Sequence, residues 1–242
     1  MKTHRFPIRF GGLLALASVA AIAAAPAAMW ADDAKDESKD KSAAKSEAGA
    51  DEEEGFVSLF DGKSLDGWKA NENVDTFKVE NGEIVVKGDR SHLFYVGDVE
   101  NHDFKNFHFK AEVMTKPKAN SGIYFHTEWQ DDGWPAKGYE AQVNQTHGDA
   151  KKTGGLYAIK DVMDKSPTGD DKWHLYEIIV KGKHITIKID GETTTDWTEP
   201  EGWKPPEQFP GRSLSSGTFA LQGHDPESEI HYRNIRVKAL ED

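Results

Sequence analysis

The stretch "NSGIYFHTEW", residues 120–129, carries the alternation on which the fold assignment depends. Ile123 and Phe125 alternate with Tyr124 and His126, directly after a turn-prone Asn-Ser-Gly sequence. Successive side chains of a β-strand point to opposite faces, so this alternation predicts a strand with two unlike faces. One face is apolar, as a protein core requires. The other face carries a phenol and an imidazole, which suit either a solvated surface or a binding site.

Short segments of the same kind follow one another through most of the chain. Two of them, 77–88 and 173–192, are predicted to be hairpins that turn at Asn81-Gly82 and at Lys181-Gly182-Lys183. No segment shows a helical apolar stripe longer than about two turns. Many short strands with regularly spaced turns are typical of an antiparallel β-sandwich or jelly roll, so we predict an all-β domain with few or no helices.

Residues 1–31 have the composition of a secretory signal peptide. Lys2, Arg5 and Arg9 form a basic start, and an alanine-rich apolar run follows over residues 11–28. This run is short for a membrane-spanning helix, which favours cleavage over a retained anchor. The chain contains no cysteine, so neither a lipidated cysteine nor a disulfide framework is expected. We predict an exported protein, periplasmic or extracellular, with no stable membrane insertion after cleavage.

Residues 32–54 are predicted to form an acidic disordered linker. They include ten acidic residues and four lysines, with no aromatic or β-branched residue, so they cannot bury enough apolar surface to fold. Residues 55–242 then form one β-sandwich domain, for which their length is sufficient. The formal net charge of the whole chain is −12. A protein of that sign does not neutralise phosphates, so a nucleic-acid partner is not expected.

Polar side chains share the outward face of several predicted strands. In 138–145, Glu140 and Gln142 alternate with apolar residues, and in 217–225 Gln222 and His224 do the same. If these segments and 120–129 belong to one sheet, their polar faces meet. The candidate site residues are His126, Glu140, Gln142, Tyr157, Gln222 and His224, with Tyr124 either packing or binding substrate.

This set of side chains differs from an ordinary solvated sheet face, which carries mostly Thr, Lys and Glu. Tyr, His, Glu and Gln suit a carbohydrate site, where aromatic faces contact sugar C–H groups and polar side chains bind hydroxyls. Glu140, His126 and His224 each also have a purely structural interpretation. No short catalytic motif is present. The proline-rich segment 197–211 is a long loop, which either borders a cleft or covers one end of a sheet.

The chain also resembles the 3-keto-disaccharide hydrolase family, whose members have the concanavalin A-like lectin/glucanase jelly-roll fold. The resemblance spans residues 55 to 240 and rests on an ordered set of motifs rather than on a single decisive one. One departure is His126, because the family commonly has arginine there. The motifs are "GFVSLFDGKSLDGWK" (55–69), "NSGIYFH" (120–126), "GYEAQVNQTHGDAKKTGGLYAIK" (138–160), "DKWHLYEIIVKGKHITIKIDGE" (171–192) and "GTFALQGHDPESEIHYRNIRVKAL" (217–240).

The resemblance implies activity on glycosides oxidised at C3. A C3 ketone acidifies the C2 proton, so a base can form an enediolate, the C1 substituent is expelled, and water then adds to the enone. Glu140 or a histidine would be the base, and Tyr157 or His224 the proton donor. Glu140 and His224 are the preferred acid–base pair, with His126, Gln142, Tyr157, Gln222 and Tyr124 positioning substrate. A divalent cation would stabilise the enolate, although no ligand set is assigned.

The sequence is compatible with two other functions. The same fold serves lectins, so the domain is alternatively a non-catalytic carbohydrate-binding module. Ordinary glycoside hydrolysis needs two facing carboxylates. Only Glu140 is a convincing candidate on the predicted polar face, so this third function ranks lowest.

Overall fold

The computed structural model describes residues 54–242. The predicted signal peptide and nearly all of the predicted linker lie outside the described residues. Within them no helix is long and apolar enough to cross a membrane. Apart from two short 3-10 helices, η1 (Val74–Thr76) and η2 (Val99–His102), the regular structure of this part is entirely β.

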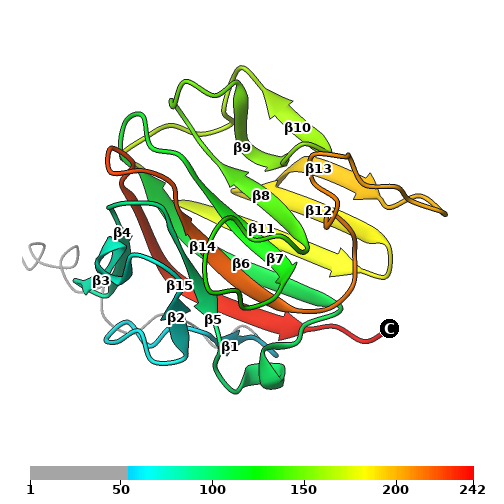
Figure 1. Cartoon of the computed structure of the whole chain (residues 1–242), viewed down its shortest axis with the longest axis horizontal. Coiled ribbons are helices and arrows are strands. Elements are labelled where there is room, and N and C mark those ends of the chain that lie inside the picture. The colour runs from blue at the N-terminus through cyan, green and yellow to red at the C-terminus, as the bar shows by residue number, and fades with distance from the viewer. Residues whose placement is uncertain (1–53) are drawn as a thin grey trace, which may run out of the picture. The chain divides into compact units, whose positions relative to one another are not determined.

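The strands form two sheets in which every pairing is antiparallel, as the sequence predicts (Figure 1). The eight-stranded sheet runs β13 (Glu192–Thr198), β12 (His184–Ile189), β11 (His174–Lys181), β6 (Phe107–Thr115), β15 (Ile230–Ala239), β4 (Glu83–Val86) and β3 (Phe77–Glu80), with β1 (Val57–Ser58) also paired to β15. The seven-stranded sheet runs β10 (Lys160–Met163), β9 (Lys151–Leu156), β8 (Tyr139–Val143), β7 (Ser121–Thr127), β14 (Thr218–Gly223), β5 (Ser91–Tyr95) and β2 (Trp68–Ala70).

The apolar core lies between the two sheets and is rich in aromatic side chains. Phe219 of β14 is fully buried, with its ring centroid 4.9 Å from that of Phe107 and 4.7 Å from that of Phe109, both on β6. Such aromatic pairs stabilise a core beyond the area that they bury. The alternation of 107–114 is therefore confirmed, because its aromatic and aliphatic face is the buried one.

Both predicted hairpins are present. Asn81 and Gly82 connect β3 to β4 with φ angles of 53° and 81°, the left-handed pair that a tight two-residue turn requires. In the second hairpin Lys181 of β11 pairs directly with His184 of β12, so Gly182 and Lys183 are the turn residues. The turn is thus one residue shorter than the sequence suggests.

His126 is the residue at which the predicted alternation fails. Thr127 pairs with Thr218 and Phe125 with Phe219, so His126 is an extra residue in β7, with a φ angle of 55°. A bulge of this kind re-aims the side chain. The imidazole packs edge-on against Phe107 at 5.6 Å between ring centroids. The prediction that His126 shares the polar face of Tyr124 is therefore wrong.

The hydrogen bonds of His126 require a neutral ring, and this predicts how stability depends on pH. Nε2 lies 2.9 Å from the Lys105 carbonyl oxygen, to which it donates, while Nδ1 accepts the Ser215 N–H at 3.2 Å. Burial lowers the pKa of His126 from 6.5 to about 4. The unfolded chain therefore binds this proton first as pH falls. We expect the free energy of unfolding to decrease from about pH 6.5 towards pH 4, with His126 contributing on the order of 3 kcal/mol over the full interval.

Urea denaturation of the full chain and of a His126→Gln variant at several pH values measures this contribution. The variant keeps a donor and an acceptor but does not titrate, so its stability should vary less with pH over the same interval. Identical pH profiles for the two proteins would show that His126 is not the group responsible.

Candidate active site

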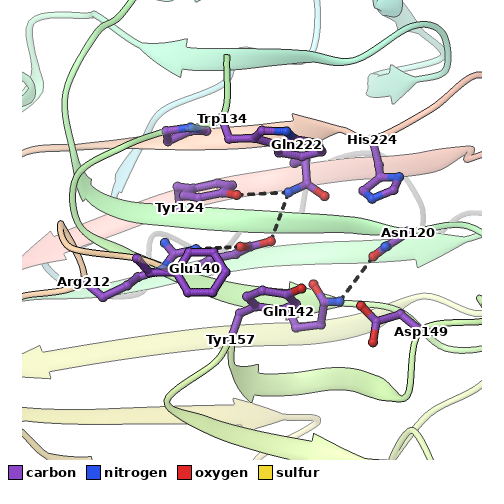
Figure 2. A pocket seen from close by; sticks show the side chains of 12 residues that line it. Asn120, Tyr124, Trp134, Glu140, Gln142, Asp149, Tyr157, Arg212, Gln222 and His224 are labelled. Carbon is purple, nitrogen blue, oxygen red and sulfur yellow. Dashed lines mark hydrogen bonds and ion pairs between the residues drawn. The ribbon is translucent and has the colours of Figure 1, made fainter. Parts of the chain in front are cut away.

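A pocket of about 230 Å³, lined by both polar and aromatic side chains, lies on the outer face of the seven-stranded sheet (Figure 2). Its shape is open, and several polar groups converge in it, as is usual in small-molecule sites. Strands β7, β8 and β14 and the residue before β7 contribute Asn120, Tyr124, Glu140, Gln142 and Gln222. Loops around the sheet contribute Trp134, Pro135, Asp149, Tyr157, Phe209, Arg212 and His224.

The pairing register explains why these side chains meet. Tyr124 pairs with Glu140 on one side and with Ala220 on the other, so a phenol, a carboxyl and a methyl group form one row across three strands. In the adjacent row Gly122 pairs with Gln142. Directly paired residues point to the same face. The small side chain of Ala220 and the absent one of Gly122 leave the space into which longer neighbours extend.

Glu140 is buried at the base of the pocket with both carboxylate oxygens occupied. Oε2 lies 2.9 Å from Arg212 Nη2, and Oε1 accepts a 3.0 Å hydrogen bond from Gln222 Nε2. Burial raises the pKa of Glu140, although Arg212 and the hydrogen bonds from Tyr124 and Gln222 act in the opposite direction. A carboxyl group with a raised pKa is a better base once ionised, and such groups cluster at functional sites.

Arg212 comes from the end of the loop that follows β13 and is equally buried. Its guanidinium carbon lies 5.3 Å from the ring centroids of both Tyr124 and Phe209, so the cation contacts two aromatic rings. Nη1 donates to the Gly138 carbonyl oxygen at 3.3 Å. The buried Nε has no hydrogen-bond partner among residues 54–242. One donor of this group therefore lacks a protein partner.

His224 forms a pair with the adjacent Asp225 at another wall of the pocket. Its Nδ1 lies 2.6 Å from Asp225 Oδ2. Burial raises the pKa of Asp225, but hydrogen bonds from His224 and Ser228 outweigh it, so the net shift is downward. An ionised Asp225 accepts from Nδ1–H and leaves Nε2 to exchange a proton with a ligand. This is the orientation in which imidazole acts as a general acid or base.

The remaining polar groups suit a ligand with several hydroxyls. Gln142 donates from Nε2 to Asn120 Oδ1 at 3.3 Å, while its buried Oε1 has no partner among the described residues. Tyr157 packs against Phe209 at 5.9 Å between ring centroids, and Lys151 Nζ lies 4.2 Å from its ring. A buried acceptor without a partner costs free energy unless a ligand satisfies it.

The structure brings together six of the seven residues proposed from the sequence. They are Tyr124, Glu140, Gln142, Tyr157, Gln222 and His224. His126 is the exception, because the bulge directs it into the core. Loop 197–211 contributes Phe209 to the wall, so this loop does border a cleft.

Arg212, Asp225 and Trp134 were not predicted, although each had a sequence signal. Arg212 directly follows the proline-rich loop, and Asp225 directly follows His224. Trp134 lies in the segment between the two strands whose polar faces were compared. Among residues 54–242 no three or more His, Asp or Glu side chains are grouped as metal ligands. The divalent cation stays a prediction.

The sequence matches the family of 3-keto-alpha-glucoside-1,2-lyase-like domains over residues 55–238. The chain belongs to this family. A curated relative from Bacteroides thetaiotaomicron, named 3-keto-disaccharide hydrolase, is 25% identical over 234 residues, which covers 78% of this chain and 79% of the relative. The resemblance proposed from the motifs is thus confirmed at the level of the family.

Solved structures of other proteins confirm the fold of this family member. A candidate glycosyl hydrolase from Parabacteroides distasonis is 25% identical, with a TM-score of 0.66 over 78% of this chain and 95% of that chain. The carbohydrate-binding module CBM66 from Bacillus subtilis shares the fold at 14% identity, with a TM-score of 0.50 over 72% of this chain and 96% of that one. Enzymes and binding modules are both built on this jelly roll, so function must be argued from the site.

Proposed function

We propose that this chain cleaves glycosides oxidised at C3, by eliminating the C1 substituent and then adding water across the resulting double bond. The observation that carries the proposal is the pairing of two unlike proton-transfer groups in one pocket. Glu140, buried beside Arg212, shares the pocket with His224, which Asp225 orients. The curated relative named 3-keto-disaccharide hydrolase supports the choice of substrate.

The reaction requires three functions from the protein. A base removes the C2 proton, whose acidity the neighbouring ketone increases, and the electron pair moves onto the C3 oxygen. The electrons return as the C1–O bond breaks, and the leaving oxygen takes a proton from an acid. The product is an enone, to which water adds: its hydroxyl bonds to C1 as a base takes the second proton of the water, and C2 receives a proton from the group that acted as base in the first step.

Glu140 is the proposed base. Its carboxylate takes the C2 proton and becomes neutral while negative charge develops on the C3 oxygen. The Arg212 cation lies 2.9 Å from Glu140 and can stabilise that oxygen as the charge leaves the carboxylate. The buried site therefore contains one anion and one cation throughout the step. Cations placed in advance at a developing oxyanion stabilise transition states strongly.

His224 is the proposed acid for the leaving group. With Nδ1 bonded to Asp225, the imidazolium donates from Nε2 to the departing oxygen, and the neutral ring then accepts a proton from the incoming water. The His224 side chain is 31% exposed, compared with 6% for Glu140. The leaving group and water can therefore exchange with solvent on the side of His224.

The positioning residues would fix the ring between these two groups. Gln142 offers its unpaired Oε1 to a sugar hydroxyl, and Tyr157 and Tyr124 offer aromatic surface and phenol groups. Burial raises the pKa of Tyr124 well above its ordinary value, so this phenol stays a hydrogen-bond donor. Gln222 holds Glu140 and also donates to the Tyr124 oxygen at 3.2 Å.

Deuterium incorporation at C2 tests this chemistry. The full chain is incubated with a 3-keto-glucoside in D₂O, and the free sugar is examined by NMR against a protein-free sample that corrects for spontaneous exchange. A glycoside deuterated at C2 should be cleaved severalfold more slowly than the protiated one, because the C2–H bond breaks during elimination, and solvent deuterium should appear at C2 whenever the proton on Glu140 exchanges before hydration. Cleavage with no isotope effect and with protium retained at C2 would instead indicate direct substitution at C1.

A non-catalytic carbohydrate-binding module is the second candidate function. The observation that favours it is Trp134, which lines the pocket and is 44% exposed. Exposed aromatic rings stack on sugars in binding modules and enzymes alike. The same NMR sample distinguishes the two functions, because a binding module leaves the glycoside intact.

A substitution at Gly122 tests whether catalysis depends on the exact position of the Glu140 carboxylate. A Cβ atom at this position would lie 2.5 Å from Glu140 Oε1, so Gly122→Ala must displace the carboxylate. We expect a reduction in kcat of about 100-fold, because displacements of about 1 Å can have that effect. Gly169→Ala is the matched control, since a Cβ there meets nothing within 4 Å. Equal turnover by the two folded variants would contradict the role of Glu140.

We also propose that the protein acts outside the cytoplasm, on the basis of the signal-like composition of residues 1–31. Expression with its own N-terminus in a bacterial host should release a mature protein that begins after the apolar run, as sequencing of its N-terminus would reveal. An intact N-terminus in the cytoplasmic fraction would contradict export.

A further inference from the structure

His92 lies beside the pocket although no step of the proposed reaction uses it. It belongs to β5 and pairs directly with Gln222 of β14. Its neighbour Leu93 packs in the core between the sheets. His92 must therefore point to the outer face, where Gln222 lines the pocket.

The imidazole of His92 is fully buried, yet neither ring nitrogen has a hydrogen-bond partner among residues 54–242. An unpaired buried polar atom costs about 1–3 kcal/mol, so it requires an explanation. The charged or titratable groups nearby are Glu72, Arg90 and His224. Burial, with smaller contributions from Arg90 and His224, outweighs the opposing effect of Glu72 and lowers the pKa of His92 to about 3. The neutral ring has one donor and one acceptor, which is what a sugar hydroxyl needs.

Trp134 lines the pocket (Figure 2), and its ring also packs edge-on against that of His92. Its ring centroid lies 5.3 Å from that of His92 and 5.4 Å from that of His224. Arg90 lies 5.7 Å from the Trp134 ring centroid. The indole is nevertheless 44% exposed, so little other structure packs on top of it. Trp134 is therefore the side chain that contacts both His92 and the pocket residue His224, with few contacts on its outer side.

The loop that carries Trp134 is organised by its own hydrogen bonds. The side chain of Gln130 donates to the Trp134 carbonyl oxygen at 3.0 Å and accepts the Ala136 N–H at 2.9 Å. A longer contact, 3.4 Å from Asn71 Nδ2 to the Gly133 carbonyl oxygen, links the loop to the chain after β2. Because Gln130 holds the loop internally, the indole can leave His92 without loss of these bonds.

We propose that His92 lies at the base of a second sugar subsite, where its ring nitrogens bond to sugar hydroxyls. This subsite opens when the Trp134 indole moves away from the imidazole. The inference rests on the proposed function, because the first ring is placed at Glu140. The backbones of β8 and β5 are three strand spacings apart, roughly 14 Å, with Tyr124 and Gln222 between the side chains of Glu140 and His92. A ring placed at Glu140 leaves the side of His92 for a second hydroxyl-bearing ring that is joined to the first.

Calorimetric titration with two ligands tests the subsite without requiring turnover. One ligand is 3-keto-glucose, and the other is a 3-keto-disaccharide in which a methylene replaces the glycosidic oxygen, so that its second ring cannot leave. We expect the full chain to bind the disaccharide at least tenfold more tightly. In His92→Leu this ratio should fall to about one, with 3-keto-glucose affinity unchanged. The variant should unfold at the same or a higher temperature, because no buried nitrogen is left unpaired.

Two further measurements separate a ligand contact from a packing role. His174→Leu replaces another buried histidine, on β11 outside the pocket, and should keep the tenfold ratio. Binding of the disaccharide should also change the tryptophan emission, and Trp134→Phe should abolish that change. Equal affinities for the two ligands in the full chain, or an unchanged ratio in His92→Leu, would overturn the subsite. Tight disaccharide binding by a chain that cleaves no 3-keto-glycoside would retain the subsite and reject the proposed function.

Discussion

Glu140→Gln is expected to lower kcat for 3-keto-glycoside cleavage by about 10²- to 10⁴-fold, the usual range for loss of a general base. The substitution keeps the shape of the side chain and an acceptor for Gln222, whose Nε2 lies 3.0 Å from the carboxylate. It removes the ability to accept the C2 proton. Steady-state kinetics on the full chain, with the folded fraction followed by circular dichroism, measure the effect.

Glu177→Gln is the matched control for this substitution. Glu177 is a second buried carboxylate, on β11 in the eight-stranded sheet, and it lies 3.6 Å from Lys110 and 3.0 Å from His108. Its replacement removes a buried charge without touching the pocket, so kcat per folded molecule should not change. If both variants lost activity equally, the effect at Glu140 would be one of stability and not of catalysis.

Arg212→Met is expected to destabilise the fold by about 3–5 kcal/mol at neutral pH, because it leaves the buried Glu140 carboxylate without its cation. Met retains apolar contact with the rings of Tyr124 and Phe209. Without the cation, the pKa of Glu140 rises further above its unfolded value. The folded protein then binds a proton that the unfolded chain releases, so stability should fall as pH rises and recover as pH decreases.

The double variant Glu140→Gln/Arg212→Met separates the ion pair from packing. Replacing both members of a buried pair is often close to neutral, whereas removing one is costly. Urea denaturation at pH 5 and pH 8 should therefore show the double variant to be more stable than Arg212→Met at pH 8. If the double variant lost the sum of the unfolding free energies that the two single substitutions remove, at both pH values, Arg212 would contribute through packing alone.

The fold was predictable because alternation is a local property of the sequence. The runs 107–114 and 184–189 place every second side chain in the core. Asn81 and Gly82 both adopt positive φ angles, which strongly favours a tight turn at this position. His126 was misplaced because a bulge depends on the partner strand. The register shift of β14 at Thr218 and Phe219 inserts one residue into β7, and the sequence of β7 carries no sign of it.

The strand-borne part of the site followed from the same alternation. Glu140, Gln142 and Gln222 were correctly expected on one polar face. Arg212 could not be found in this way, since it belongs to a loop and no periodicity indicates where a loop side chain points. Its position depends on long-range contacts, such as the 3.0 Å hydrogen bond from the Gly138 N–H to the Gly211 carbonyl oxygen. Trp134 and the covered His92 are equally a result of tertiary packing.

Comparative turnover of a 3-keto-glucoside and its unoxidised parent by the full chain tests the central claim most directly. A C3 ketone is required to acidify the C2 proton that Glu140 removes, so the ketone should be cleaved and the parent left intact. Cleavage of both glycosides at similar rates, or of neither, would contradict the account.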